Sequence, residues 1–266
     1  MTKTSRALHG LDSLDVDRFH RLGYLLLPGF LPGDLVADLQ HEADRWVDSG
    51  LRERSIACCR HPERYGLPPV VELDMPAHGR VVGHPPLLEI LRELIGDAFV
   101  FHHLHSVRLA PDEPGKPWHH DYEQRPQSNR DSMMLHTLHY LDGLDVNQAS
   151  LVLFPGSHRD VAAKDAWIHL GTSELAGEAL VDDLPRGSTV LLHSALFHAR
   201  RPRPGGRAGC ARYMVDASYC QVGTTWPPVK PFWRHILQRG QELGLDGGRW
   251  PELFSARHFS EYRRQT

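Results

Sequence analysis

The chain has 266 residues, of which 41% are hydrophobic and 24% are charged, and its formal net charge at pH 7 is -3. These values are typical of a globular protein with a sizeable core, and we expect residues 1–266 to form one domain. No block of like charge favours binding to nucleic acid or to an anionic membrane. No apolar run approaches the roughly 20 residues that span a bilayer, and residues 1–10 lack the apolar region of a signal peptide. Four cysteines without CxxC spacing predict reduced thiols, so we expect a cytoplasmic protein.

Residues 1–97 are expected to form an N-terminal helical layer and a first strand. Residues 14–23 predict a short helix that leads into the apolar strand 24–27. Apolar residues recur at helical spacing in a second helix, which starts near Pro32 and ends at Gly50: Leu35, Leu39, Ala43 and Trp46. Residues 51–80 are rich in proline and charge, and we expect them to be irregular, whereas residues 87–95 predict an amphipathic helix.

Short apolar or alternating runs begin after residue 98 and are separated by turn residues: 99–109, 133–141, 151–154, 189–193 and 212–219. Several strands at this spacing predict a β-sandwich or barrel, here as the core 98–220 under a helical layer. Residues 221–266 form a C-terminal extension with a helix near 232–243. The extension is suited to covering a site or to forming a dimer; the sequence decides neither this nor the oligomeric state.

Residues 117–122 contain a His-x-Asp pair, His119 and Asp121. On a strand, side chains at positions i and i+2 point to the same face, about 6.5–7 Å apart along the chain. Both can therefore bind one metal ion. His120 makes the histidine ambiguous, but only His119 has a carboxylate two positions later.

A third ligand should come from a distant strand, and residues 187–198 offer His193 and His198. Two imidazoles and one carboxylate form the facial triad that suits octahedral Fe(II) and leaves three coordination positions open. Zinc accepts the same ligand types, although a structural zinc site normally has a fourth. Arg207 and Arg212 lie on or near the next expected strand. A guanidinium binds the far carboxylate of a dicarboxylate co-substrate in a bidentate manner, but for either arginine alone a surface position is the simpler interpretation.

Four segments, in the same order along the chain, resemble the phytanoyl-CoA dioxygenase family. Residues 23–31, with the helix that follows, are similar to the family's opening, and Trp118-His119-His120-Asp121 resembles its Trp-His-Gln-Asp element. Residues 147–158 are similar to its stretch ending in Pro-Gly-Ser-His, and residues 187–198 resemble the segment with its distal metal ligand. The chain departs from the family at Arg200, where many members have a serine that contacts the co-substrate.

The resemblance implies a mainly β fold with helices: a double-stranded β-helix (a jelly-roll or cupin-like barrel) with a helical layer on one sheet. It implies that His119, Asp121 and His198 bind Fe(II) and form the catalytic centre, with 2-oxoglutarate and dioxygen as co-substrates and ascorbate as a stimulant. By this alignment Arg207 binds the far carboxylate of 2-oxoglutarate, and Arg212 is the second choice. The resemblance assigns two further co-substrate contacts to Leu138 and Ser106.

The same family implies oxidative decarboxylation of 2-oxoglutarate to succinate and carbon dioxide, coupled to hydroxylation of an unactivated C–H bond. The intact Asp121 favours hydroxylation, or a desaturation or cyclisation variant of it. We expect a small organic substrate, such as a natural product, with contacts from four residues: Tyr122, Arg125, His136 and Tyr140. The other histidines of the predicted strands are interpreted as structural or surface residues: His102, His103, His105 and His139.

Two other interpretations are open. One is a different metal enzyme on the same barrel, such as a cupin-type zinc or manganese hydrolase or isomerase, and it would not depend on 2-oxoglutarate. The other is a metal-free binding protein of the same fold, which would retain the three ligand residues without using them.

Overall fold

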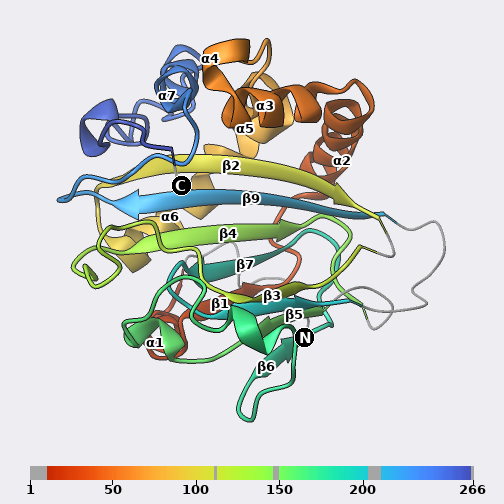
Figure 1. The fold of residues 1–266 in the computed structure, drawn as a ribbon, viewed down its shortest axis with the longest axis vertical. Coiled ribbons are helices and arrows are strands. Elements are labelled where there is room, and N and C mark those ends of the chain that lie inside the picture. Colours follow the sequence, from red (N-terminus) through yellow and green to blue (C-terminus); the bar gives the residue numbers. More distant parts are fainter. Residues whose placement is uncertain (1–10, 111–112, 146–149, 203–210, 265–266) are drawn as a thin grey trace.

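The computed structural model describes residues 11–110, 113–145, 150–202 and 211–264. Within these ranges the chain forms two β-sheets and a set of helices (Figure 1). The strands are β1 Tyr24–Leu27, β2 Phe99–Leu109, β3 Lys116–His119, β4 Met134–Tyr140, β5 Ser150–Leu153, β6 Ala179–Val181, β7 Ser188–His193, β8 His198–Arg201 and β9 Arg212–Gln221. The α-helices are α1 Ser13–Leu22, α2 Gly33–Asp48, α3 Leu51–Arg60, α4 Pro62–Tyr65, α5 Pro76–Val82, α6 Pro85–Ile95 and α7 Trp233–Glu242. Short 3₁₀ turns lie at η2 Glu72–Asp74, η3 Ser157–Arg159, η4 Ile168–Leu170 and η5 Ala256–His258.

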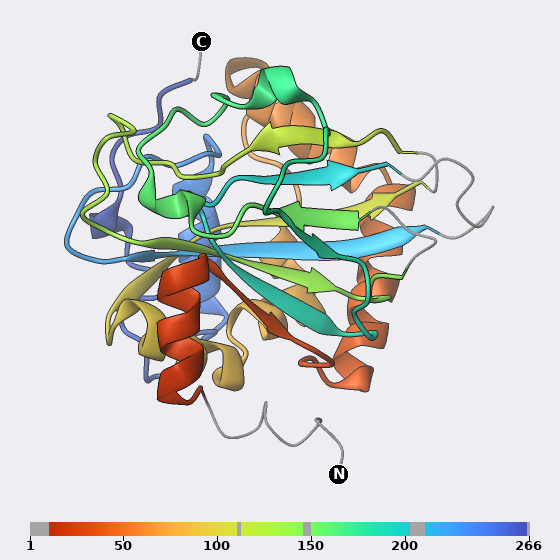
Figure 2. The ribbon, with the colours of Figure 1, turned by 90° about the horizontal axis from the view of Figure 1, so that it is seen from below.

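Two antiparallel sheets face each other (Figure 2). The larger has the order β1-β7-β4-β9-β2 and the smaller has the order β3-β8-β5-β6. From β2 to β9 this order is that of a double-stranded β-helix, with β1 added at one edge. The predicted fold class is therefore confirmed, although no hydrogen-bonded ladder among the described residues closes the two sheets into one continuous barrel.

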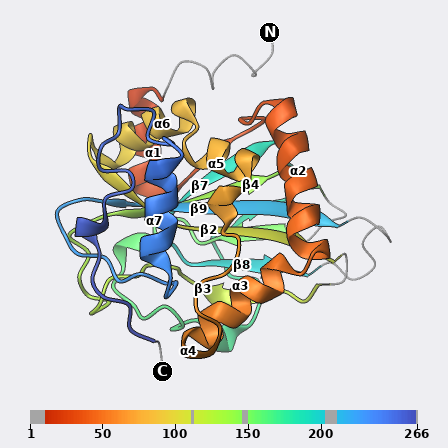
Figure 3. The same ribbon diagram turned by 90° about the horizontal axis from the view of Figure 1, so that it is seen from above.

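A layer of helices covers the outer face of the five-stranded sheet (Figures 1 and 3). Outward-facing strand residues such as Val215 and Tyr219 share one apolar cluster with Leu35 of α2, Leu91 of α6 and Ile236 of α7. The alternate, inward-facing residues pack in a second cluster between the sheets, among them Leu138, Tyr140 and Leu192. The predicted helical layer on one sheet is confirmed, and α7 adds a C-terminal helix to it.

The prediction that residues 51–80 are irregular is wrong, because α3, α4, η2 and α5 lie there. The helix α5 begins at Pro76, and its first amide groups are capped from a distant part of the chain. Ala77 N donates to Glu42 Oε1 at 2.9 Å, and His78 N donates to Glu42 Oε2 at 3.1 Å. A cap supplied by α2 stabilises the helix start but leaves no local sequence signal.

The described residues contain no helix with both the length and the apolar character needed to cross a membrane. Cys58, Cys59 and Cys220 are free thiols.

Candidate metal centre

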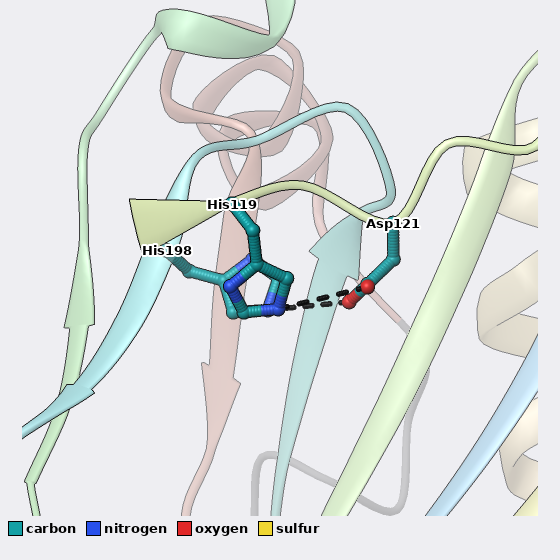
Figure 4. Close-up of side chains that lie close together, drawn as sticks. All are labelled: His119, Asp121 and His198. Carbon is teal, nitrogen blue, oxygen red and sulfur yellow. Dashed lines mark ion pairs between the residues drawn. The ribbon is translucent and has the colours of Figure 1, made fainter. Parts of the chain in front are cut away.

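Three side chains predicted as metal ligands converge between the two sheets (Figure 4). His119 is the last residue of β3 and His198 is the first residue of β8, and the antiparallel register places them directly opposite each other. Asp121 follows two residues after the end of β3. One ligand atom from each of the three lies within 4.8 Å of the other two.

Backbone hydrogen bonds fix the loop that carries Asp121. Asp121 N donates to Ser194 O at 2.7 Å, and His120 N donates to Lys164 O at 3.1 Å. The imidazole of His120 turns the other way, with its Nε2 hydrogen-bonded to Ala162 O at 3.1 Å. The ambiguity of the histidine doublet is thereby resolved, because only His119 shares a face with Asp121.

Both imidazoles direct Nε2 toward the carboxylate. The Nδ1 atom of His119 donates to Pro117 O at 2.7 Å, and the Nδ1 atom of His198 donates to Leu196 O at 3.0 Å. Their Nε2 atoms lie 3.6 Å and 3.2 Å from Oδ1 and Oδ2 of Asp121. Ligands about 2.1 Å from one ion and at right angles lie about 3 Å apart, so the three groups fit a metal ion. The buried Nε2 of His119 has no hydrogen-bond partner in the described chain, which is expected of an atom that binds a metal ion.

Metal ligands must be deprotonated, and two of the three side chains are in that form at neutral pH. Burial and the nearby His198 lower the pKa of His119 to about 3. Burial alone would raise the pKa of Asp121, but the hydrogen bond and charge of His198 lower it well below its usual range. At neutral pH the site therefore presents a neutral imidazole and a carboxylate.

His193, the second candidate for the distal ligand, lies elsewhere. It ends β7, and its Nδ1 accepts a hydrogen bond from Ala195 N at 3.1 Å. Its ring stacks near Tyr122, with centroids 6.3 Å apart, and lies 4.9 Å from that of His158. The structure thus brings His198, and not His193, to Asp121.

Residues predicted to bind the co-substrate fall in different places. Arg207 lies outside the described residues, whereas Arg212 is buried at the start of β9 and its guanidinium lies 4.8 Å from the ring centroid of Tyr140. Leu138 and Tyr140 are in the cluster between the sheets. Ser106 pairs with the outward-facing Val215, so it lies on the opposite face of β2, under the helices. The structure does not bring Ser106 to the metal ligands.

A cavity of about 500 Å³ opens beside Asp121, and we call it the metal-side cavity. Its lining residues come from α3, β2, β3, the loop after β3, β4, β9 and the C-terminal extension: Cys59, Arg60, His103, His105, Lys116, Asp121, Glu123, His136, Asp216, Val229, Tyr262 and Arg264. His136 is therefore placed where a substrate contact was predicted. The other three predicted contacts are not among these lining residues.

Tyr122 is fully buried and its hydroxyl donates to Ser132 O, so it stabilises the loop after the metal ligands. Arg125 is exposed on that loop. Tyr140 faces the interior but lies at the far end of β4, next to Arg212. Of the four predicted substrate contacts, only His136 lines the metal-side cavity.

Nothing in the sequence indicated that several of these residues line the metal-side cavity. The interpretation of His103 and His105 as structural or surface residues was incomplete, because both line the cavity. Their alternation on β2 was visible, but the face that they occupy depends on the pairing of β2 with β9. The C-terminal extension contributes Tyr262 and Arg264 to the cavity lining, and Phe101 N of β2 donates to Leu253 O of the extension at 2.7 Å.

Comparison with solved structures supports the class of fold. The chain is similar to the apo structure of HygX from Streptomyces hygroscopicus, with 17% identity, a TM-score of 0.60 and coverage of 82% of this chain and 89% of that one. It is also similar to SnoN, a non-haem α-ketoglutarate-dependent epimerase from nogalamycin biosynthesis, with 17% identity, a TM-score of 0.58 and coverage of 81% and 85%. At these identities the likeness shows a shared fold.

The sequence identifies the family. The model of the phytanoyl-CoA dioxygenase (PhyH) family matches residues 19–203, and the chain belongs to this family. No curated protein sequence matches the chain significantly.

Proposed function

We propose that this protein is an Fe(II)- and 2-oxoglutarate-dependent dioxygenase, with the metal bound by His119, Asp121 and His198. The observation that carries the proposal is the convergence of two Nε2 atoms and one carboxylate, with both Nδ1–H groups already donated to backbone carbonyls. Two imidazoles and one carboxylate leave three positions for a co-substrate and dioxygen. When bound, iron supplies the oxidation of a C–H bond that no side chain can perform, coupled to the conversion of 2-oxoglutarate to succinate and carbon dioxide.

Arg212 is the residue that we assign to the far carboxylate of 2-oxoglutarate. Its side chain is buried. It lies on the same face of β9 as Met214, two residues later, and Met214 packs against the cluster between the sheets. Arg212 therefore faces the space between the sheets. Burial raises the pKa of Tyr140 and keeps its hydroxyl protonated, while Arg212 hydrogen-bonds to this residue. A guanidinium beside a phenol offers donors to a carboxylate. Leu138, two residues before Tyr140, provides apolar packing along the same face.

Arg200 lies near this end of the site. It is paired in register with Lys116 and Leu151, and burial, together with the charge of Arg212, lowers its pKa without removing its proton. Its Nη2 donates to Pro114 O at 2.7 Å. We propose that Arg200 adds positive charge where other family members have a serine.

The substrate is proposed to be a small organic molecule bound in the metal-side cavity and oxidised next to Asp121. Hydroxylation is the reaction that we favour, with desaturation or cyclisation as variants. One similar structure, SnoK, is described as a non-haem α-ketoglutarate-dependent carbocyclase from nogalamycin biosynthesis, which supports the inclusion of cyclisation. HygX has been solved with nickel and 2-oxoglutarate bound. The chain's own residues orient the substrate and exclude water.

The test is succinate formation from 2-oxoglutarate by anaerobically purified protein, supplied with Fe(II), air and ascorbate. We expect slow turnover without a substrate, which requires iron and disappears in His119→Ala. The matched control is His120→Gln, because His120 is adjacent in sequence but points away from the site. Equal succinate formation in His119→Ala and in the wild type would contradict the proposed metal centre.

A further inference from the structure

A histidine–aspartate pair lies beside the metal ligands and is not part of the metal centre. The Nδ1 atom of His136 on β4 lies 2.9 Å and 3.0 Å from Oδ1 and Oδ2 of Asp216 on β9. The side chains are 3% and 13% exposed. Since the carboxylate accepts from Nδ1–H, the orientation of the ring is fixed, and Nε2 is the atom left for other interactions.

The Nε2 atom of His136 is buried and has no hydrogen-bond partner in the described residues. The same residue lines the metal-side cavity together with Asp216 and Asp121. An unsatisfied buried polar group is unfavourable, and native proteins retain few of them without a reason. A ligand atom in the cavity would satisfy this nitrogen.

Two more histidines extend the wall that His136 forms. The His103 ring lies 5.5 Å from that of His136 and 4.8 Å from that of His105, measured between centroids. Ser218 Oγ lies 2.8 Å from His103 Nδ1 and holds this ring in place. Burial lowers the pKa of His103 well below its usual value, so this ring is neutral at pH 7, whereas His105 is exposed. Burial also opposes protonation of His136, but the charge and hydrogen bond of Asp216 raise its pKa above the usual value. His136 is thus the member of the wall that most readily donates from Nε2.

The charges that line the metal-side cavity are unevenly paired. Each of its three carboxylates is engaged: Asp121 with the metal-binding histidines, Glu123 with Lys164, and Asp216 with His136. Its cations are Arg60, Lys116 and Arg264, and all three are exposed. In the described chain no ion pair engages Arg60 or Arg264, and the nearest carboxylate to Lys116 Nζ is that of Asp121, at 4.0 Å. The lining charges without an ion pair are therefore cationic, which favours a negatively charged ligand.

We propose that the metal-side cavity recognises an oxyanion of the substrate, a carboxylate or a phosphate, through Nε2–H of His136 with Arg60 and Arg264 at the rim. This inference rests on the proposed function and names the chemical class of its substrate. The pair of His136 and Asp216 positions the substrate by a charge-assisted hydrogen bond, which is stronger than a hydrogen bond between neutral groups. The oxyanion then lies beside Asp121 and brings the rest of the molecule to the metal.

This subsite is distinct from the one proposed for 2-oxoglutarate. His136 and Tyr140 are on the same face of β4 and four residues apart, so their Cα atoms are separated by about 13 Å. Arg212 lies at the Tyr140 end of the strand, whereas Asp121 and the metal-side cavity lie at the His136 end. A five-carbon dicarboxylate that is chelated to the metal and held by Arg212 extends away from His136.

The experiment uses the full-length protein loaded with Zn(II), a diamagnetic substitute for iron, and saturated with 2-oxoglutarate. Acetate and inorganic phosphate are titrated separately, and the imidazole C–H signals are followed by NMR, with His136 assigned by its loss in His136→Gln. We expect at least one anion to shift the His136 signal saturably, beyond the effect of sodium chloride at equal ionic strength. The anion that binds more tightly identifies the oxyanion as carboxylate or phosphate.

The variants test the individual contacts. In Arg60→Gln and in Arg264→Gln we expect weaker anion binding, by about threefold each, as measured by the midpoint of the same shift. In His136→Gln, the affinity measured by isothermal titration should fall by about tenfold, the loss of one hydrogen bond to a charged group. The matched control is Arg18→Gln, which removes the same charge from the exposed face of α1 and should leave anion binding unchanged.

Three results would overturn the inference. One is that neither anion shifts the His136 signal beyond the salt control. Another is that 2-oxoglutarate alone shifts the signal fully and the anions add nothing, which would assign the dyad to the co-substrate. The third is equal anion affinity in Arg60→Gln, Arg264→Gln and Arg18→Gln. Failure of the proposed function is recognised separately, as absence of 2-oxoglutarate binding to the Zn(II) protein.

Discussion

The two faces of the five-stranded sheet differ in how their buried histidines are bonded. His139 points outward from β4, and both of its ring nitrogens have partners: Nδ1 lies 2.8 Å from Thr189 Oγ1 and Nε2 lies 3.1 Å from Thr137 Oγ1. His136, three residues earlier, points inward and has one bonded nitrogen and one without a partner. The two residues are similarly buried, so burial alone does not separate them.

This difference shows how one strand can serve stability on one face and ligand binding on the other. The outer face is closed by helices, and its polar atoms at His139 are satisfied within the protein. The inner face opens at one end into the metal-side cavity, where His136 retains an unbonded Nε2. Variants of the outer face should therefore change stability, and variants of the inner face should change ligand binding.

The largest effect on stability is expected from Lys230→Met. Lys230 packs against the outer face of β2. Lys230 Nζ donates to Glu72 Oε1 at 2.6 Å and to Leu104 O at 2.8 Å, and both charged side chains are buried. Removing the ammonium leaves a buried carboxylate unpaired, which costs about 3–5 kcal/mol in the free energy of unfolding measured with urea. The additional change Glu72→Gln should restore part of the loss; a double variant no more stable than Lys230→Met would contradict this explanation.

Leu135→Ala tests the outer face by packing alone. Leu135 is fully buried, adjacent in sequence to His136, and packs under the helices. Deleting a buried leucine side chain costs about 2–5 kcal/mol, and urea unfolding measures the change. The affinity for 2-oxoglutarate at a temperature where the variant is folded should stay at the wild-type value; a large loss of affinity would show that the two faces are not independent.

Arg212→Gln tests the inner face at the end proposed for the co-substrate. The variant loses a guanidinium that is suited to a bidentate carboxylate contact, so we expect the Kd of 2-oxoglutarate to rise by a factor that corresponds to about 1.5–3 kcal/mol. Isothermal titration of the Zn(II) protein measures this change. Arg18→Gln is the control for the loss of charge, and an unchanged Kd in Arg212→Gln would shift the assignment to Arg207.

The smallest expected effect is a change in the pH dependence of the free energy of unfolding in Asp216→Asn. Asp216 raises the pKa of His136 above its unfolded value, so the pair contributes stability that is fully present below about pH 6.5. This contribution is lost as the pH rises through the pKa of His136 in the folded protein. The free energy of unfolding should therefore fall more steeply above pH 6.5 in the wild type than in Asp216→Asn. Equal slopes would show that the dyad does not titrate as described.

Much of the fold could be predicted because its signals are local. The five predicted strand runs correspond to β2, β4, β5, β7 and β9, with ends that differ by two residues or fewer. The pair His119 and Asp121 could be found because both lie within three residues of chain. Its partner His198 needed the resemblance to the family, since spacing alone allowed His193 equally.

The parts that escaped prediction depend on contacts between distant segments. The start of α5 is capped by Glu42, which accepts a hydrogen bond from Ala77 N, 35 residues later in the chain. Asp216 meets His136 from 80 residues away, and Tyr262 and Arg264 reach the cavity from the C-terminal extension. Because the register of β2, β4 and β9 decides which side chains face inward, a one-residue shift would exchange the two faces, and no local pattern fixes that register.

The central claim is tested most directly by binding of Fe(II) and 2-oxoglutarate under anaerobic conditions. Chelation of 2-oxoglutarate to Fe(II) in a facial triad gives a visible charge-transfer absorption, which can be titrated in the wild type, His119→Ala and His120→Gln. We expect one equivalent of bound Fe(II) and a saturable absorption in the wild type and in His120→Gln, and neither in His119→Ala. The same absorption at full strength in His119→Ala, or none in the wild type, would contradict the central claim.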